Sequence, residues 1–425
     1  MPKLLLRTLS AGVLCLCGLT GCENFFGDKT DLDFIDVPEF QAREVAYVPI
    51  FPIIQDDPDP SDTNYFTPVS LAIGFDRLTY AVDAGNNRVV VFDASGRPVG
   101  SLPAPAPRTI TLDGQPRTLL SRFTGGIVQD RKLDLLVVGT IDTVINNTFY
   151  TLATIFRYDL KGQGGYGPAE ARVTNRVIHP FYLKQSVNTD DGRVRFRDVA
   201  ILGDNRYYVT RNGPRANAFG GPDDAVLVFS ADDARFSPVF VATGAGVLNN
   251  FFRDPLGITT TVQPPQLPQS NYPEDFYVTL ADGATAFKVV GISVAVSDAG
   301  QSYVLIPPAP VDTTRADRYL YEPFRFSRPT DVTLTGDGTN FLFVVDETKD
   351  SLYQFTQAGL EGVPPPPGSI NPTKVVPVSF GGGSGETDFN RPVAVAYDSR
   401  TVYVADILPD GRGRILRFRL TIDFD

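Results

Sequence analysis

The chain has 425 residues, of which 42% are hydrophobic and 11% aromatic, enough apolar material for a large folded core. Its formal net charge at pH 7 is −11. So acidic a surface repels phosphate backbones and gains nothing electrostatically from anionic lipids. These numbers exclude general disorder and argue against a nucleic-acid partner.

The first 21 residues have the pattern of an export signal. Lys3 and Arg7 supply a positive start, residues 4–19 are apolar, and small residues precede Cys22. The stretch Leu19-Thr20-Gly21-Cys22 resembles the lipobox of bacterial lipoproteins, in which the cysteine is acylated and becomes the mature N-terminus. The alternative is an ordinary signal peptide that happens to contain a cysteine. The resemblance implies a cell-envelope protein, lipid-anchored to a bacterial membrane and either periplasmic or surface-exposed.

A polar, acidic segment without periodicity follows the signal. We expect residues 22–43 to be the acylated N-terminus and a flexible tether, and residues 44–425 to be a single domain. Cys15 and Cys17 would leave with the signal, so the mature chain would keep only Cys22 and form no internal disulfide. Loss of the two basic residues in the signal would shift the net charge to −13.

From residue 68 onward, short alternating strands and turns repeat as a unit. The clearest copy spans residues 68–102, with strands expected at 69–73, 78–82, 89–92 and 98–102. The same order returns near the C-terminus and four times in between, once clearly and three times weakly. Those copies start at Gly125, Asp198, Pro255, Pro329 and Pro392.

Four-stranded units repeated in this way are typical of a β-propeller, in which each blade buries its faces against its neighbours. The strands and the Asp83…Asn86-Asn87-Arg88 turn resemble those of the NHL-repeat family of six-bladed propellers. The expected fold is therefore all-β, with four-stranded antiparallel blades. Residues 291–296 either close the fourth blade, which gives the preferred six blades, or begin a seventh. Residues 44–49 are expected to supply the strand that the last copy lacks.

The residues that could carry chemistry are few. His179 is the single histidine, so no histidine cluster for zinc, copper or iron is available. Asp83, Asp346 and Asp406 occupy equivalent positions at the ends of second strands, where calcium could find oxygen ligands. The family resemblance instead gives this aspartate and the following arginine, Arg88 in the best copy, a structural part within the blade. No cofactor is expected, with calcium as the alternative.

Long links between second and third strands give a second pointer, because binding residues commonly lie on such loops. They are expected at 142–148, 211–225 and 408–413, all on one face of a propeller. Residues 211–219 mix arginine, amide and aromatic groups, which suit carboxylate, sugar or peptide contacts. The alternative is that these are ordinary surface residues. The candidate ligand-binding residues are Asp83, Arg88, Asp142, Arg211, Asn212, Arg215, Phe219, Asp346 and Asp406. The proline run 363–367 is expected to be a stiff connector between blades, or else a polyproline ligand.

Two functions fit these observations. The first is a non-enzymatic binding or scaffold propeller that contacts a protein or glycan partner and is attached to the membrane through its acyl anchor. The second resembles the gluconolactonase and sugar-dehydrogenase propellers, calcium-dependent enzymes that would need three or four carboxylates or amides at the centre. Asp83, Asp142, Asp346 and Asp406 are the candidates for that centre. The lack of a histidine set or a nucleophile motif favours the first.

Overall fold

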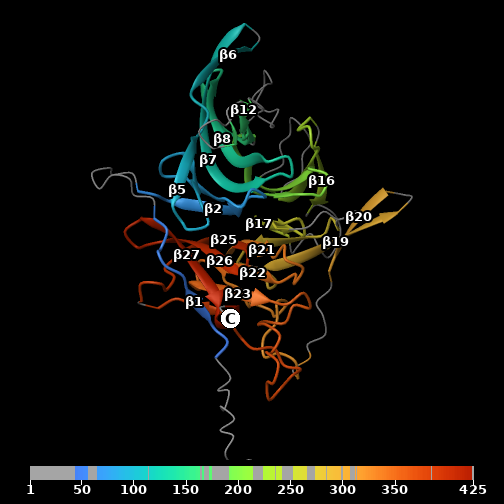
Figure 1. The fold of residues 1–425 in the computed structure, drawn as a ribbon. Helices are drawn as coiled ribbons and strands as arrows, with labels where there is room; N and C mark the ends of the chain where they lie inside the picture. The colour runs from blue at the N-terminus through green and yellow to red at the C-terminus, as the bar shows by residue number, and fades with distance from the viewer. Residues whose placement is uncertain are drawn as a thin grey trace, which may run out of the picture. The chain divides into compact units, whose positions relative to one another are not determined.

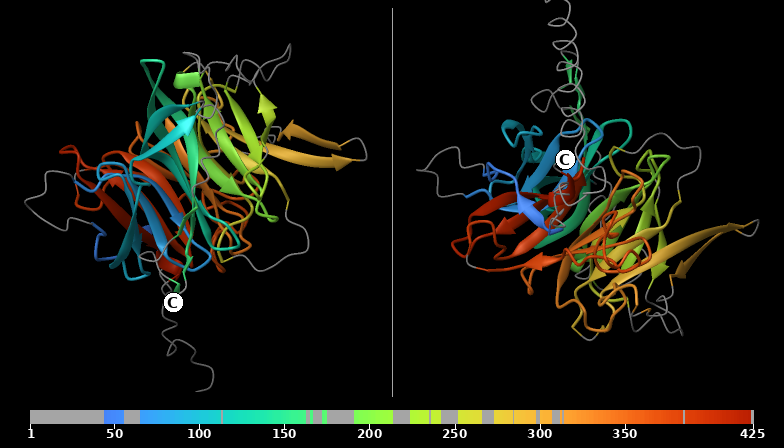
Figure 2. Two further views of the ribbon diagram at one scale, coloured as in Figure 1. Left: turned by 90° about the horizontal axis from the view of Figure 1, so that it is seen from above. Right: turned by 60° about the horizontal axis from the view of Figure 1, so that its bottom comes forward.

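Six sheets follow one another along the chain and surround a common axis. The computed structural model describes residues 44–423 apart from 56–64, 113, 163–164, 167–171, 175–190, 214–223, 235, 242–251, 266–272, 284, 298–299, 307–311, 313 and 384. Figure 1 labels five inner strands around its middle: β2 (Pro68–Ile73), β7 (Gln115–Gln129), β17 (Pro255–Thr260), β21 (Pro329–Leu334) and β25 (Pro392–Asp398). Figure 2 shows the same sheets from two further sides.

Each sheet is one blade of antiparallel strands, and its first strand lies nearest the axis, except in blade II, where that strand is β7. Blade I contains β2 (Pro68–Ile73), β3 (Thr79–Asp83), β4 (Arg88–Phe92) and β5 (Pro98–Pro103). Blade II contains β6 (Arg108–Leu112), β7 (Gln115–Gln129), β8 (Asp134–Ile145), β9 (Thr148–Asp159) and β12 (Arg172–Thr174). Blade III contains β13 (Arg195–Ile201), β14 (Tyr207–Asn212), β15 (Ala225–Phe229) and β16 (Phe236–Val241).

The second half of the ring repeats this order. Blade IV contains β17 (Pro255–Thr260), β18 (Phe276–Leu280), β19 (Val289–Ser297) and β20 (Gly300–Leu305). Blade V contains β21 (Pro329–Leu334), β22 (Leu342–Asp346), β23 (Ser351–Phe355) and β24 (Phe380–Gly381). Blade VI contains β25 (Pro392–Asp398), β26 (Thr401–Ile407), β27 (Gly413–Leu420) and β1 (Tyr47–Pro49). A small β10–β11 hairpin (Lys161–Gly162 and Gly165–Tyr166) and the short 3-10 turns η4 (Asp191–Arg193) and η6 (Thr421–Asp423) complete the described elements.

The six-bladed prediction is confirmed, and the strand over residues 291–296 closes blade IV rather than starting a seventh. One hydrophobic cluster lies at each of the six junctions between neighbouring blades. The middle strands bury side chains on both faces; all five residues of β3 and of β22 are buried. Burial on both faces explains why second strands read as continuous apolar runs instead of alternating.

The N-terminal segment closes the ring, as expected from the sequence. β1 pairs with β27, with Tyr47 opposite Leu420, and Ile54 bridges to Ile415 further along the same strand. Blade VI is thus assembled from both ends of the compact unit Val45–Asp425, so unfolding one end exposes an unpaired edge of the other.

Two rims follow from the strand directions. The start rim is where each inner strand begins and each second strand ends; the end rim is where the inner strand ends. Since β1 starts beside the last residue of β27, the chain enters the propeller at the end rim. No helix in the described part of the chain is both long and apolar enough to span a bilayer.

Two sequence-based expectations about links are wrong. Residues 142–148 do not form a loop: β8 and β9 continue as a twelve-residue hairpin, turned by Asn146 and Asn147 with φ of 50° and 61°. Positive φ at both central residues is what a tight two-residue hairpin turn demands, and asparagine tolerates it well. The proline run joins β23 to β24 within blade V, so it does not connect two blades.

Candidate functional site

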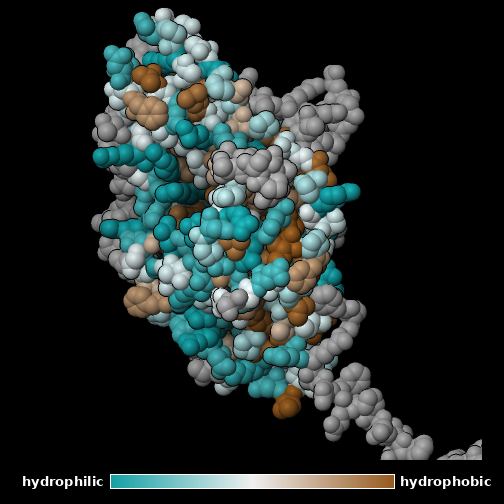
Figure 3. Space-filling view, turned by 90° about the vertical axis from the view of Figure 1, so that its left-hand side faces the viewer, coloured by the Kyte–Doolittle hydropathy of each residue, from teal (hydrophilic) through white to brown (hydrophobic). Residues whose placement is uncertain are grey.

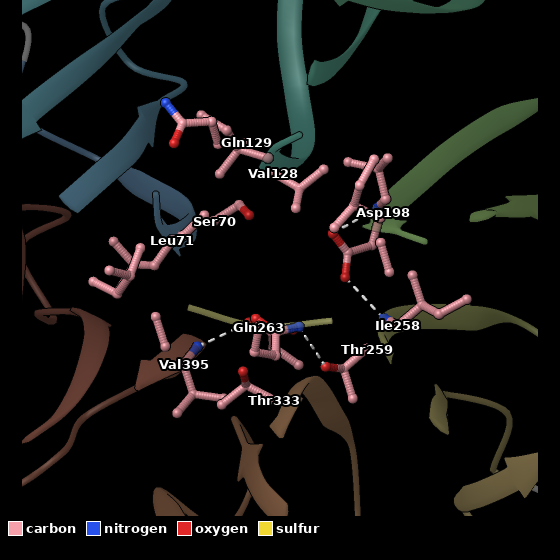
Figure 4. Close-up of a pocket in the computed structure, with 18 of the residues that line it drawn as sticks. Ser70, Leu71, Val128, Gln129, Asp198, Ile258, Thr259, Gln263, Thr333 and Val395 are labelled. Carbon is pink, nitrogen blue, oxygen red and sulfur yellow. Dashed lines mark hydrogen bonds between the residues drawn. The ribbon is translucent and has the colours of Figure 1, made fainter. Parts of the chain in front are cut away.

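A narrow cavity runs along the axis, lined by all six inner strands (Figure 4). Its volume is about 50 Å³, room for a few water molecules. Ser70, Thr259 and Thr333 contribute hydroxyls, and Gln263, which follows β17, donates to the Thr259 hydroxyl at 3.1 Å. Gln263 lies near the middle of the ring of labelled side chains in Figure 4.

Two carboxylates face this axis, Asp198 on β13 and Asp331 on β21. Asp198 accepts main-chain N–H groups from Val199 and, across the blade junction, from Ile258, both at 2.8 Å. Asp331 accepts in the same way from Val332 at 2.7 Å and from Val395 of the next blade at 2.8 Å. Each aspartate therefore joins two neighbouring inner strands.

A glycine of the preceding blade makes room for each axial aspartate. A Cβ added to Gly126 would lie 1.9 Å from Oδ1 of Asp198, and one added to Gly257 would lie 2.9 Å from Oδ1 of Asp331. Both distances are too short for a real side chain. The equivalent positions of the six inner strands are therefore small or aspartate: Ser70, Gly126, Asp198, Gly257, Asp331 and Ala394.

Burial favours the protonated form of these two carboxyls. Desolvation raises the pKa of Asp198 to about 7, against the opposing effect of its two N–H donors. Desolvation, and then the charge of Asp198, raises the pKa of Asp331 well above its ordinary value. Two interacting carboxyls titrate as a pair, so the axis can hold a proton near neutral pH.

The cavity does not fit calcium or a quinone cofactor. Calcium takes six to eight oxygen ligands, whereas the carboxylate oxygens of Asp198 and Asp331 each already accept a main-chain N–H. Within the described ranges there is no group of three or more His, Cys, Asp or Glu side chains arranged to hold a metal ion. The volume is also far below the several hundred Å³ of pockets that bind organic ligands.

The three equivalent aspartates of the second strands lie on the start rim, each bonded within its own blade. Asp83 accepts from the Thr67 N–H and from Arg88 Nε, both at 3.0 Å. Asp346 accepts from the Arg328 N–H at 3.0 Å. Each side chain is fully buried and fastens the segment that leads into its inner strand.

Asp406 shows the same arrangement most completely. It accepts the Asn390 and Arg391 N–H groups at 2.9 and 2.8 Å and pairs with Nε and Nη2 of Arg414 at 2.9 and 2.8 Å. Asp83, Asp346 and Asp406 do not line the axial cavity. Their contacts match the structural part that the family resemblance implied.

The remaining candidates are distributed over blade III and outside the described residues. Arg211 and Asn212 end β14, and both are buried; Asn212 donates to Asp254, while Nη1 of Arg211 lies 3.4 Å from the Gly213 carbonyl. Arg215 and Phe219, like Cys22 and His179, fall outside the described residues.

Asp142 lies in the elongated part of blade II, which extends past the start rim. There β6, β7, β8 and β9 form a sheet whose one face packs through Ile141 and Ile145 onto blade I. On the other face, Asp142 accepts from Nε of Arg122 at 2.8 Å and from the Thr151 hydroxyl at 2.7 Å. A hollow of about 420 Å³ opens along this hairpin.

Three large apolar side chains are exposed on that second face. Leu120 pairs directly with Asp142, and Val144 pairs with Phe149, so all four side chains point to the same side. The exposed fractions of Leu120, Val144 and Phe149 are 40%, 53% and 63%. We call Leu120, Val144 and Phe149, with the Arg122–Asp142 ion pair beside them, the blade II patch. Figure 3 shows hydrophobic residues among hydrophilic ones at the top of the view, where this sheet lies.

Sequence reasoning missed both the axial pair and the blade II patch. A signal existed for each. An aspartate directly before the buried second half of an inner strand marks Asp198 and Asp331, and Asn146-Asn147 between alternating residues marks the hairpin.

No protein-family model matches the chain, and a search of curated proteins finds no relative. Among solved structures, the aldose sugar dehydrogenase of Streptomyces coelicolor in its PQQ-bound form is 11% identical, with a TM-score of 0.47 over 89% of this chain and 98% of that one. The calcium-binding protein regucalcin of Agrobacterium tumefaciens is 8% identical, with a TM-score of 0.44 over 84% and 90%. Virginiamycin B lyase of Staphylococcus aureus is 10% identical, with a TM-score of 0.40 over 88% and 99%. The class established by strand order is thus a six-bladed, all-β propeller.

Proposed function

We propose that this propeller is a binding module of the bacterial cell envelope, held at a membrane by an acylated Cys22, and that its blade II patch contacts a protein partner. The observation that carries the proposal is the exposure of Leu120, Val144 and Phe149 on one face of a sheet that extends past the ring. Monomeric proteins rarely keep adjacent large apolar side chains in water without a use for them.

The geometry of the patch suits a protein better than a sugar. The strands β8 and β9 are long and paired throughout, and β7 pairs with β8 from Leu120 to Phe123, so the three side chains project from a rigid surface and lose little freedom on binding. Arg122, whose side chain is 65% exposed and is held by the buried Asp142, supplies a polar group beside the apolar side chains, as rims of protein interfaces do. If the partner were a glycan, soluble oligosaccharides would compete with it for the blade II patch.

Acylation is proposed from the sequence, and its test is direct. Metabolic labelling with a fatty acid should mark the wild-type protein, and Cys22→Ser should abolish the label and shift the protein from the membrane to the soluble fraction. An unlabelled wild-type protein that fractionates as soluble would refute the anchor.

The partner is tested by the size of the complex in gently solubilised envelopes. The wild-type protein is expected to migrate as a complex with its partner. The double variant Leu120→Thr, Phe149→Ser is expected to migrate at the size of the free propeller. The matched control, Val99→Thr, changes a side chain of similar exposure, 44%, on the outer strand β5 of the neighbouring blade I, near the end rim, whereas the patch extends past the start rim. Equal complex sizes for all three proteins would contradict the proposal.

The axial geometry gives less support to a calcium-dependent enzyme. Asp83, Asp142, Asp346 and Asp406, the carboxylates proposed for its centre, each bond within their own blade. The carboxylates that do face the axis are Asp198 and Asp331, and each of their oxygens accepts one main-chain N–H.

A further inference from the structure

The proline run that precedes β24 belongs to a surface segment with unusual properties. Residues 364–375 form the tip of a long link, closed at its base by the bridge between Val363 and Val376. The tip contains five prolines, and its turn is fixed by the Ser369 N–H and hydroxyl, which donate to the Pro366 carbonyl at 3.2 and 2.6 Å. We call residues 364–375 the proline tip.

Ile370 is fully exposed at this tip. Its relative exposure of 104% is the largest among the exposed large hydrophobic residues of the described chain. The rigid turn beneath it means that the side chain cannot relax easily onto the protein surface. An isoleucine held out in water in this way costs free energy that burial in an apolar medium would recover.

The tip also differs in charge from the rest of the chain. From Val363 to Phe380 the sequence contains no acidic residue and one basic residue, Lys374, although the whole chain carries 49 acidic residues. Lys374 pairs with Asp317 at 2.7 Å and is half-buried. The tip itself therefore presents no carboxylate to an anionic lipid headgroup, and the carboxylate of the neighbouring Asp317 is paired with Lys374.

The tip and the incoming chain share one end of the propeller. The link leaves the end of β23, on the end rim, and the chain enters at the same rim. Val45, the first residue of the compact unit, packs with Val363 and Val378 at the base of the tip. The proposed anchor, Cys22, lies 23 residues before Val45 in the sequence, so it is connected to the propeller at this rim.

We propose that the proline tip inserts Ile370 into the headgroup region of the membrane that holds the acyl anchor. The inference rests on the proposed function, because the anchor brings the tip to the bilayer and the tip then acts as a second, weak contact. The end rim would face the lipid, and the blade II patch, on the start rim, would face away from it toward its partner.

The test uses the acylated full-length protein in vesicles of phosphatidylethanolamine and phosphatidylglycerol. Since the one cysteine expected in the mature chain is acylated, Ile370→Cys introduces a single reactive thiol for an environment-sensitive fluorophore. Thr373→Cys, an exposed neighbour, repeats the measurement if the first variant folds poorly. Val144→Cys on the start rim is the matched control.

On vesicles, the labels at 370 and 373 are expected to shift their emission to shorter wavelength and to be quenched by lipids carrying a nitroxide. The label at 144 should show neither change. If the protein floats with the vesicles but the labels at 370 and 373 behave like the one at 144, the inference is overturned. If the wild-type protein does not float at all, the anchor itself fails, which is a separate result.

Discussion

At the scale of residues, buried ion pairs rather than exposed ones fasten the turns of this propeller. Arg414 is 5% exposed and Asp406 is not exposed at all, and the arginine also donates to the carbonyls of Glu386 and Asp388. Arg97 and Asp93 form a similar pair at 3.1 Å, but the arginine is 77% exposed. Solvent screens the second pair and not the first.

Arg414→Ala is therefore expected to lower the free energy of unfolding by about 3–5 kcal/mol, because it leaves the Asp406 carboxylate buried without its partner. Arg97→Ala should change stability little. Chemical denaturation measures the free energy of unfolding of both variants. If both lose similarly little free energy of unfolding, the hydrogen bonds of Asp406 do not stabilise the turn.

The axial aspartates predict an unusual pH dependence. Burial raises the pKa of Asp198 to about 7, so the folded protein keeps a proton that the unfolded chain releases near pH 4. The stability gained from this proton is complete below about pH 4 and is lost as the pH rises through about 7. Asp331, whose pKa is raised by burial and by Asp198, adds to the same trend.

Asp198→Asn, which does not titrate, is expected to flatten the change in melting temperature between about pH 4 and 7. Asp93→Asn is the control, because hydrogen bonds from Ser95 and Arg97 lower the pKa of Asp93 to about 2 and place its titration outside that range. If the melting temperature of Asp198→Asn changes with pH as steeply as that of the wild-type protein, the axial carboxyls are ionised over this whole pH range.

At the scale of elements, ring closure depends on a short N-terminal segment. Ile50, directly after β1, donates its N–H to the Arg417 carbonyl at 2.8 Å, and the same segment continues to the Ile54–Ile415 bridge. A proline at position 50 removes this donor and leaves the carbonyl unpaired.

Ile50→Pro is expected to cost about 1–3 kcal/mol more than Ile50→Ala, since both lose the side chain but only proline loses the hydrogen bond. Limited proteolysis should cut the proline variant first in the N-terminal segment. Equal stability and equal digestion of the two variants would show that residues 44–54 do not hold the ring closed.

Sequence patterns predicted the elements well because each blade is a local hairpin series. Alternation and turn residues located inner strands at Pro68, Pro329 and Pro392, and the missing strand of blade VI led to residues 44–49. Patterns within one copy cannot show which side chains meet at the axis. The meeting of Asp198 and Asp331 depends on the closure of the whole ring, and on Gly126 and Gly257 in other blades.

At the scale of the whole molecule, the two rims have different characters. The start rim carries the blade II patch and the buried aspartate caps, while the end rim carries the proline tip and receives the chain from the proposed tether. An envelope protein built in this way would hold its membrane contact and its partner contact at opposite ends of the blades.

Metal removal tests the main rival function on the intact propeller. Because no described carboxylate cluster suits calcium, elemental analysis is expected to find no tightly bound calcium, and a chelator is expected to leave the melting temperature unchanged. One tightly held calcium per chain, with a large loss of stability on chelation, would favour an axial-metal enzyme and justify assays with lactones and sugars.

The most direct measurement is site-specific photo-cross-linking in the native envelope, from position 149 in the blade II patch and, as the control, from position 99 on β5. The binding-module account predicts one discrete adduct from position 149 that Leu120→Thr abolishes, and none of that size from position 99. Adducts that are absent, or that form equally from both positions, would contradict the claim that this patch is where the propeller binds its partner.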